Sequence, residues 1–226
     1  MIEFFFEQYY VLIIILGVGT ILSFVWVYFF NKEKLNLKWW QALIAVLSAT
    51  TIGVLALRFF ALLEGGFDIQ KSGNLSFFGG IFVLPLFAFV FSKIKKIPMG
   101  LILDVFTVVL VILSFGRINC IIGGCCYGKY IGYTDIRYPT REIELGFDVL
   151  FLALAIFLNI KDKLQGRVYF LYLMSYGLLR FIIEFMRHAE TESAFHIGHA
   201  WALLSILIGA GFFVFLTIKE KEKNKQ

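Results

Sequence analysis

The chain has 226 residues, of which 60% are hydrophobic and only 16% are charged. An ordinary soluble domain of this length has fewer apolar residues to bury, so the composition excludes that class and indicates a membrane protein. The formal net charge of +5 does not indicate nucleic-acid binding, because the sequence offers no basic soluble face that could contact a nucleic acid.

About 20 apolar residues are enough to cross the hydrocarbon layer of a bilayer, and seven such segments are present. The third and fifth are short, so each could pack inside the bundle or be partly re-entrant. The first lacks the basic start and cleavage site of a signal peptide, so we expect it to be retained. The predicted fold is all-α: a single transmembrane domain over residues 1–226, with spans at Tyr9–Phe30, Trp39–Leu63, Phe77–Phe91, Met99–Ile122, Gly146–Ile160, Val168–Phe185 and Ala200–Ile218.

Basic residues are concentrated in alternate loops. They follow the first, third, fifth and seventh spans, at Lys32, Lys34, Lys38, Lys93, Lys95, Lys96, Lys161, Lys163, Arg167, Lys219, Lys221, Lys223 and Lys225. Cytoplasmic loops carry an excess of Lys and Arg. This asymmetry predicts an N-terminus outside the membrane and a C-terminus in the cytoplasm.

Three arginines lie inside apolar segments, near the outer ends of the second, fourth and sixth spans: Arg58, Arg117 and Arg180. An ionised side chain at such a depth costs roughly 2.5 to 3.5 kcal/mol. Glu184 is a candidate counter-charge, because it shares a helix face with Arg180 and Tyr176. The arginines could snorkel to the interface or link helices. A single carboxylate does not neutralise three guanidinium groups, however, so we favour an anionic phospholipid headgroup as their ligand.

Several segments resemble, in order, the motifs of the prolipoprotein diacylglyceryl transferase family. The stretch "EQYYVL" resembles the family's opening motif and places Tyr10 at its tyrosine, and "ALRFF" places Arg58 at its second-helix arginine. Four further stretches match the family's glycine pair, its Gly-Arg signature, its Pro-containing motif and its Tyr-Gly-x-x-Arg motif: "LSFFGGIF", "FGRINCIIGGCCYG", "YPTREIE" and "YGLLRFIIEFMR".

The resemblance implies an enzyme of the bacterial inner membrane that needs no cofactor or metal. It would transfer the diacylglyceryl group of phosphatidylglycerol to the lipobox cysteine of a prolipoprotein, whose signal peptide it would bind within the membrane lipid. By the resemblance, Arg117 and Arg180 hold the lipid phosphate, Glu184 braces Arg180, and Tyr10 and Tyr176 supply hydroxyl groups. The remaining residues expected at the substrate are Arg58, Gly79, Gly80, Gly124, Cys125, Cys126 and Gly128.

The chain also departs from the family pattern. Phe78 stands where the family has a histidine, and a phenylalanine cannot transfer a proton. Glu144 is the nearest surviving candidate for a general base. Other departures are Cys120, Cys125, Tyr138, Arg141 and Ile143. They leave open a paralogous transferase with another acceptor.

Three cysteines, Cys120, Cys125 and Cys126, lie beside several glycines at the outer end of the fourth span. They could be small packing residues, or they could act as thiols in a membrane oxidoreductase. Their C-x4-C-C spacing is not a zinc pattern. A non-catalytic lipid binder or transporter, using only the arginines, is a further alternative.

The outer loops are expected to form a polar vestibule from residues Glu64 to Leu75 and Lys129 to Gly146, above a cavity open sideways to the outer leaflet. We expect His188, His196 and His199, in and beside the last outer loop, to be interfacial polar groups rather than ligands.

Overall fold

The computed structural model describes residues 2–67, 75–132, 134–187, 195 and 197–223. Within these ranges every regular element is a helix, and seven helical stretches are long and apolar enough to cross a membrane. The elements are α1 (Ile2–Val25), a π-helical segment (Trp26–Phe30), α2 (Asn31–Leu35), α3 (Trp39–Glu64), α4 (Phe77–Lys95), α5 (Met99–Ser114), a 3-10 turn (Phe115–Arg117), α6 (Ile118–Ile122), α7 (Thr140–Ile160), α8 (Val168–Met186) and α9 (Ile197–Lys223).

The seven predicted spans are confirmed, with corrections at their ends. The third span is a regular helix of 19 residues and the fifth one of 21, so neither is re-entrant. The fifth begins at Thr140 rather than at Gly146. Its first turns carry charged residues that look like a loop in the sequence, but the side chains of Arg141 and Glu144 are buried, whereas Glu142 is exposed. The seventh begins at Ile197 rather than Ala200.

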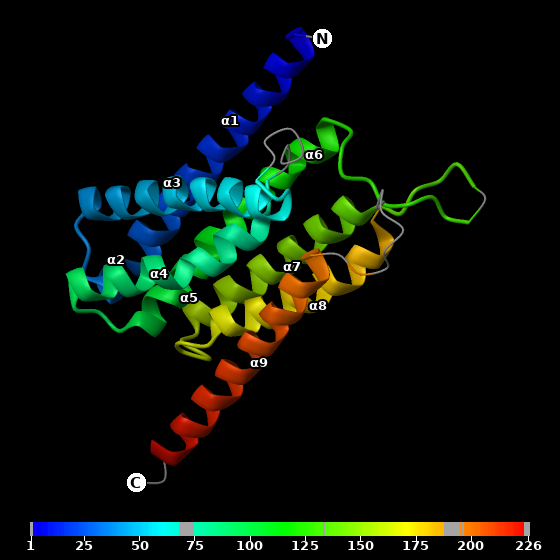
Figure 1. The fold of residues 1–226 in the computed structure, drawn as a ribbon. Coiled ribbons are helices and arrows are strands. Elements are labelled where there is room, and N and C mark those ends of the chain that lie inside the picture. Colours follow the sequence, from blue (N-terminus) through cyan, green and yellow to red (C-terminus); the bar gives the residue numbers. More distant parts are fainter. Residues whose placement is uncertain (1, 68–74, 133, 188–194, 196, 224–226) are drawn as a thin grey trace.

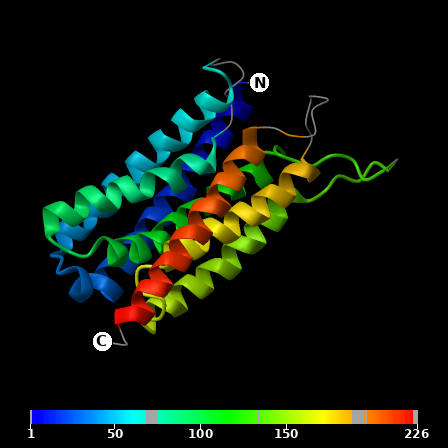
Figure 2. The same cartoon turned by 60° about the horizontal axis from the view of Figure 1, so that its bottom comes forward.

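Helix α5 forms the centre of the bundle, and α1, α4, α7 and α8 all pack against it (Figure 1). All of its side chains from Ile102 to Ile112 are buried, whereas α1 from Tyr10 onward and α9 expose large apolar side chains. A helix that is apolar on every face suits the interior of a membrane bundle. The termini lie at opposite ends of the molecule, and α9 runs beside α8 in both ribbon views (Figure 2).

Close helix contacts are made possible by glycines. A Cβ atom on Gly79 of α4 would lie 2.1 Å from the carbonyl oxygen of Ala56 on α3. On the α8–α9 interface, a Cβ atom on Gly209 would lie 2.6 Å from the backbone nitrogen of Met174. Small residues let helices approach closely in membranes, where van der Waals packing replaces much of the hydrophobic driving force.

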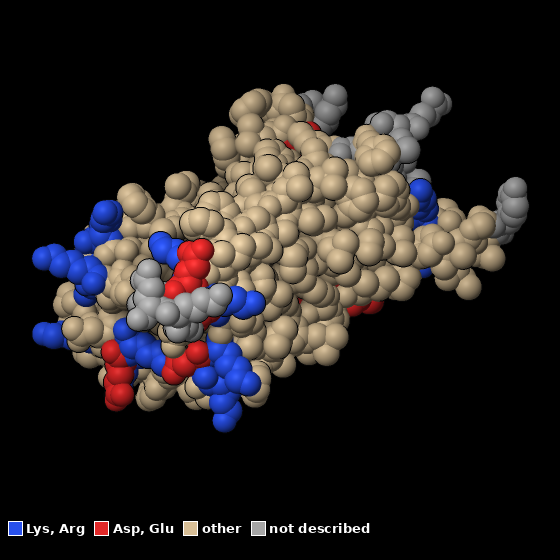
Figure 3. All heavy atoms as spheres, turned by 90° about the horizontal axis from the view of Figure 1, so that it is seen from below, with Lys and Arg blue, Asp and Glu red and all other residues tan. Residues whose placement is uncertain are grey.

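The basic loops gather at the end of the bundle where α9 finishes, while the flank beside them is almost uncharged (Figure 3). Lys34 pairs with Asp162 and so links the α2 segment to the α7–α8 turn. Arg167 pairs with Glu220 of α9 at 2.6 Å. The common location of these loops agrees with the charge pattern of the sequence. The assignment of this end to the cytoplasm stays a prediction.

Candidate active site

Arg117 reaches the interior because the fourth span changes its helical form just before it. Helix α5 ends at Ser114, a 3-10 turn covers Phe115–Arg117, and α6 follows. The guanidinium group of Arg117 forms an ion pair with Glu144 of α7. Its Nε lies 3.8 Å from a carboxylate oxygen of Asp148, one turn further along α7, and its Nη2 donates to the hydroxyl of Tyr176 at 3.4 Å.

Arg180 of α8 meets the same carboxylate. Its Nη1 donates to Glu144, and its Nη2 lies 3.1 Å from Glu184, one turn along α8. Glu184 is also 3.9 Å from Arg187. Glu144 is only 3% exposed, so a buried carboxylate holds two guanidinium groups that come from different helices. We call Arg117, Arg180, Glu144, Glu184 and Asp148 the ionic centre.

The ionic centre corrects the charge argument made from the sequence. Glu184 is not the only counter-charge, because Glu144 and Asp148 also face the arginines. Asp148 is fully buried and was missed by the sequence analysis. A signal was available, since Glu144 and Asp148 are four residues apart and therefore share a helix face.

One donor of the ionic centre is not used. The Nε of Arg117 is buried and has no hydrogen-bond partner among the described residues. Buried polar groups are usually hydrogen-bonded, so an unsatisfied one in a native site calls for an explanation. A guanidinium group with a spare donor can accept an additional oxygen ligand without losing its existing pair.

Aromatic side chains of α4 and α8 pack against one side of the ionic centre. The ring of Phe77 lies 5.8 Å from Cζ of Arg117 and 5.3 Å from the ring of Tyr176. Phe78 also packs on Tyr176, with ring centroids 5.9 Å apart. These rings exclude water from one side of the ion pairs and so strengthen the electrostatic interactions within them.

An apolar groove runs from this aromatic side between four helices. It is lined by Leu16 of α1, Leu57 of α3, Phe77 and Gly80 of α4, and Leu110 and Leu113 of α5, among others. Phe77 lines the groove and also lies 5.8 Å from Cζ of Arg117, so the groove passes within one side chain of the ionic centre, although no residue of that centre lines it. The site therefore places paired guanidinium groups beside a hydrocarbon-compatible groove.

Comparison with known sequences identifies the family to which this site belongs. Residues 2–215 match the family described as prolipoprotein diacylglyceryl transferase. The chain belongs to this family. A protein of Dehalococcoides mccartyi strain 195, named phosphatidylglycerol–prolipoprotein diacylglyceryl transferase, is 26% identical over 94% of this chain and 91% of its own length. Proteins of the same name from Rickettsia bellii (31% identical over 65% of this chain and 62% of theirs) and Clostridium tetani (30% over 45% and 47%) are also similar.

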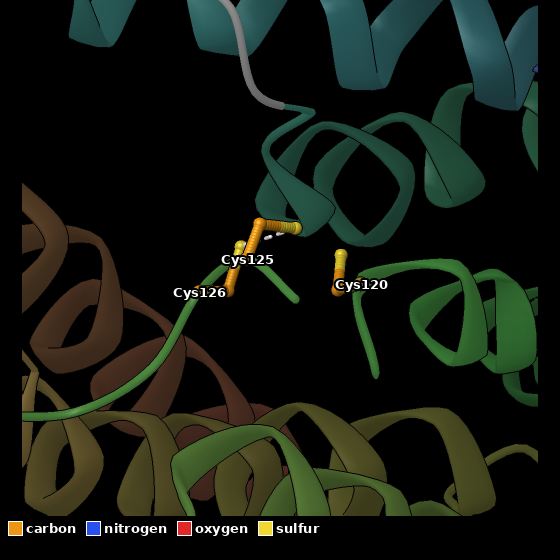
Figure 4. Close-up of side chains that lie close together, drawn as sticks. All are labelled: Cys120, Cys125 and Cys126. Atoms are coloured by element: carbon orange, nitrogen blue, oxygen red, sulfur yellow. Dashed lines mark hydrogen bonds between the residues drawn. The ribbon is translucent and has the colours of Figure 1, made fainter. Parts of the chain in front are cut away.

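The members of this family are transferases, and seven apolar helices identify this one as a multi-pass membrane protein. The segment that resembles the family's Gly-Arg signature continues into the three cysteines, whose side chains lie close together in Figure 4. All three sulfur atoms lie within 4.8 Å of one another, and those of Cys125 and Cys126 are 3.6 Å apart. All three thiols are free and half-buried.

Arg141 holds the cysteine segment in place. This residue belongs to the stretch expected to form the polar vestibule, Lys129 to Gly146, but it is only 6% exposed. Its Nη1 donates to the carbonyl oxygens of Cys120 at 3.0 Å and Cys125 at 3.1 Å. The hydroxyl of Thr140 donates to the carbonyl oxygen of Cys126 at 3.1 Å. The start of α7 thus anchors the backbone on which the thiols are carried.

Cys126 lies in an electropositive setting. A hydrogen bond with Cys120, together with the nearby charges of Arg187 and Arg117, lowers the pKa of Cys126 to about 5 although its partial burial opposes this shift. Burial and the neighbouring Cys126 raise the pKa of Cys125. At neutral pH we therefore expect Cys126 to be the most readily ionised thiol outside the spans.

The glycines predicted to approach a substrate take different places. At Gly79 and Gly128, other protein atoms occupy the space that a side chain would need. A Cβ atom on Gly128 would lie 2.6 Å from the carbonyl oxygen of Met186. Gly80 lines the apolar groove. Gly124 has a φ of +62° and borders a polar cleft in the outer loop. Packing thus explains two of the four, and a lining position explains the others.

Two further predicted residues belong to α3 and α1, which supply no residue to the ionic centre. Arg58 is half-buried on α3, next to Leu57, whose backbone nitrogen would lie 2.8 Å from a Cβ on Gly79. Tyr10 is 63% exposed on α1. Their proposed contacts with substrate stay predictions.

The predicted vestibule corresponds in part to an outer polar cleft lined by Gly124, Tyr127, Asp135, Arg137, Pro139 and Glu142. Ser76, just before α4, donates to Glu64 at the end of α3 at 2.6 Å; residues 68–74 between them lie outside the described residues. The expectation for His199 is wrong, because it is 1% exposed among the rings of Phe181 and Phe185. His188 and His196 lie outside the described residues.

Proposed function

We propose that this protein transfers the diacylglyceryl group of phosphatidylglycerol to the lipobox cysteine thiol of a prolipoprotein, at the bacterial inner membrane. The observation that supports this most directly is a buried centre of two guanidinium groups beside an apolar groove, with Phe77 between them. The names of the relatives provide the substrate pair.

In this proposal an acyl chain lies in the groove past Leu110 and Gly80, and the lipid phosphate meets Arg117 and Arg180. The phosphate exchanges places with Glu144, whose carboxylate now occupies both guanidinium groups. The unused Nε of Arg117 gives the incoming phosphate a first hydrogen bond before any existing ion pair breaks. Binding is then an exchange of one anion for another.

The chemical step forms a carbon–sulfur bond. The thiolate of the acceptor attacks the glycerol carbon that carries the phosphate, and the carbon–oxygen bond breaks with its electron pair leaving on glycerol phosphate. Arg117 and Arg180 stabilise the charge that develops on the leaving group. Glu144, displaced from the arginines, takes the proton of the thiol, the role that Phe78 cannot perform.

The test uses protein reconstituted in vesicles of phosphatidylglycerol with a lipobox peptide, and mass spectrometry of the peptide. We expect a diacylglyceryl thioether from the wild type and a loss of about 10²-fold in Arg117→Lys, because lysine keeps the charge but cannot bind two oxygens side by side. The matched control is Arg167→Lys, which changes an arginine paired with a glutamate at the other end of the bundle.

The same assay separates the alternatives. Product with a small thiol but none with the lipobox peptide would favour a paralogous transferase with another acceptor. No thioether with either acceptor, in a protein whose controls are folded, would refute the proposal. If the protein is instead a membrane thiol oxidoreductase, it should catalyse thiol–disulfide exchange, and Cys→Ser variants should abolish that reaction whereas Arg117→Lys should not.

A further inference from the structure

We propose that Cys120, Cys125 and Cys126 form a binding site for one soft, thiolate-binding metal ion. This inference does not depend on the transferase function, because it concerns the outer turn after α6 and its test needs neither lipid nor acceptor.

The distances between the sulfur atoms are close to those of thiolates bound to one metal ion. Sulfurs bound to a single ion at about 2.3 Å can be no more than about 4.6 Å apart, and in tetrahedral geometry they are about 3.8 Å apart. The Cys125 and Cys126 sulfurs are already 3.6 Å apart. All three lie within 4.8 Å of one another, so small side-chain rotations complete the geometry.

The backbone is arranged in advance for this purpose. Arg141 fixes the carbonyl oxygens of Cys120 and Cys125, and Thr140 fixes that of Cys126. Cys126 has a φ of +62°, in the left-handed region that a residue with a side chain rarely adopts. Strained backbone of this kind persists where its surroundings hold it and is concentrated at functional sites.

The arrangement also explains why the spacing of the cysteines does not indicate a metal site. The C-x4-C-C spacing lacks the paired motifs of zinc sites, but the chain turns at Gly123 and Gly124, and the backbone nitrogen of Cys125 bonds to the carbonyl oxygen of Cys120 at 3.1 Å. This turn brings the ends of the motif together. Figure 4 shows the three thiols grouped at that turn.

The chemistry of the ligands defines the class of ion. Three thiolates select soft ions such as Cu⁺, Zn²⁺ or Cd²⁺ over Mg²⁺ or Ca²⁺. Among the described residues, no His or carboxylate joins the three sulfurs as a fourth ligand. The site therefore suits a three-coordinate Cu⁺, or a Zn²⁺ or Cd²⁺ ion that keeps an exchangeable position. Binding replaces the thiol protons, so it releases protons to solvent.

The test is a titration of the full-length protein in detergent micelles, reduced, freed of metal and kept without oxygen. Cd²⁺ gives an ultraviolet charge-transfer band for each bound thiolate, and the chain contains only 3 cysteines. We expect saturation at one ion per protein with the band intensity of three thiolates. Parallel titrations with Zn²⁺, and with Cu⁺ against a competing chelator, identify the preferred ion.

Each single Cys→Ser variant is expected to keep about two thirds of the band and to bind at least about tenfold more weakly, because one ligand is lost. Mg²⁺ serves as the control ion and should not compete. A wild-type band of two thiolates or fewer, or Ser variants that bind Cd²⁺ as tightly as the wild type, would overturn the site. The wild-type result needs no variant to fold.

Discussion

Two buried polar clusters lie near opposite ends of the bundle, and they differ in what satisfies their charges. At the end of the bundle where α9 finishes, Asp104 of α5 accepts hydrogen bonds from the backbone nitrogens of Gly166 and Val168. In the ionic centre at the other end, Glu144 is held by the side chains of Arg117 and Arg180. Backbone donors cannot leave their partner without unfolding the turn, whereas side chains can change partners. Asp104 is therefore suited to hold the structure together, and the ionic centre is suited to exchange ligands.

The largest expected effect is on activity. Arg180→Ala removes one guanidinium group from the leaving phosphate and should lower kcat/KM by about 10² to 10³-fold. The rate is measured by thioether formation in vesicles at peptide concentrations well below saturation. Arg167→Ala, at the Asp104 end, is the matched control. An equal loss in both variants would show that the two clusters do not differ in function.

At Asp104 we expect the opposite pattern, a loss of stability without a loss of activity. Asp104→Ala leaves the buried nitrogens of Gly166 and Val168 without an acceptor, at about 1 to 3 kcal/mol each, so unfolding should become easier by about 3 kcal/mol. Thermal unfolding in detergent measures this loss. The activity of the molecules that remain folded should be unchanged. A specific loss of activity at low temperature would contradict a purely structural role for Asp104.

A third prediction tests the electropositive field beside the ionic centre. Because the pKa of Cys126 is lowered to about 5, its thiolate predominates above that pH and disappears as the pH falls below it. Alkylation by iodoacetamide at pH 6 should therefore label Cys126 first. Arg187→Gln removes one of the causes and should raise this pKa, slowing the labelling several-fold at pH 6. Lys129→Gln is the control, and peptide mapping identifies the labelled cysteine.

The smallest effect is expected at the ion pair between a buried arginine, Arg167, and an exposed glutamate, Glu220, at the end of the bundle where α9 finishes. Arg167 lies 2.6 Å from Glu220, whose side chain is 52% exposed. Surface ion pairs contribute about 0 to 1 kcal/mol. Glu220→Gln should change the free energy of unfolding by less than about 1 kcal/mol, and added salt should change it little further. A larger loss would place this pair with Asp104 among the groups that hold the bundle together.

Most of the fold could be predicted from the sequence, because runs of apolar residues report membrane spans directly. The start of α7 could not. The stretch from Thr140 to Glu144 is polar and looks like a loop, yet Arg141 is buried through its bonds to the carbonyl oxygens of Cys120 and Cys125. Those partners are distant in sequence, so no local pattern reveals them.

The candidate site was predicted in part. Arg117, Arg180 and Glu184 stand out because charged residues are rare in apolar segments. Their pairing through Glu144 depends on how α6, α7 and α8 meet, which sequence spacing does not determine. The inference that Glu184 is the single protein counter-charge of the arginines was wrong for this reason. His199 was also misjudged, since its burial depends on phenylalanines of α8.

The double engagement of Glu144 has a consequence for the resting enzyme. Because Glu144 neutralises Arg117 and Arg180, the protein without substrate needs no lipid headgroup as a counter-charge while it remains in the bilayer between turnovers. In the proposed exchange, the lipid phosphate competes with Glu144 for the two guanidinium groups. The affinity for lipid is then limited by the strength of these ion pairs, and their return favours release of the product.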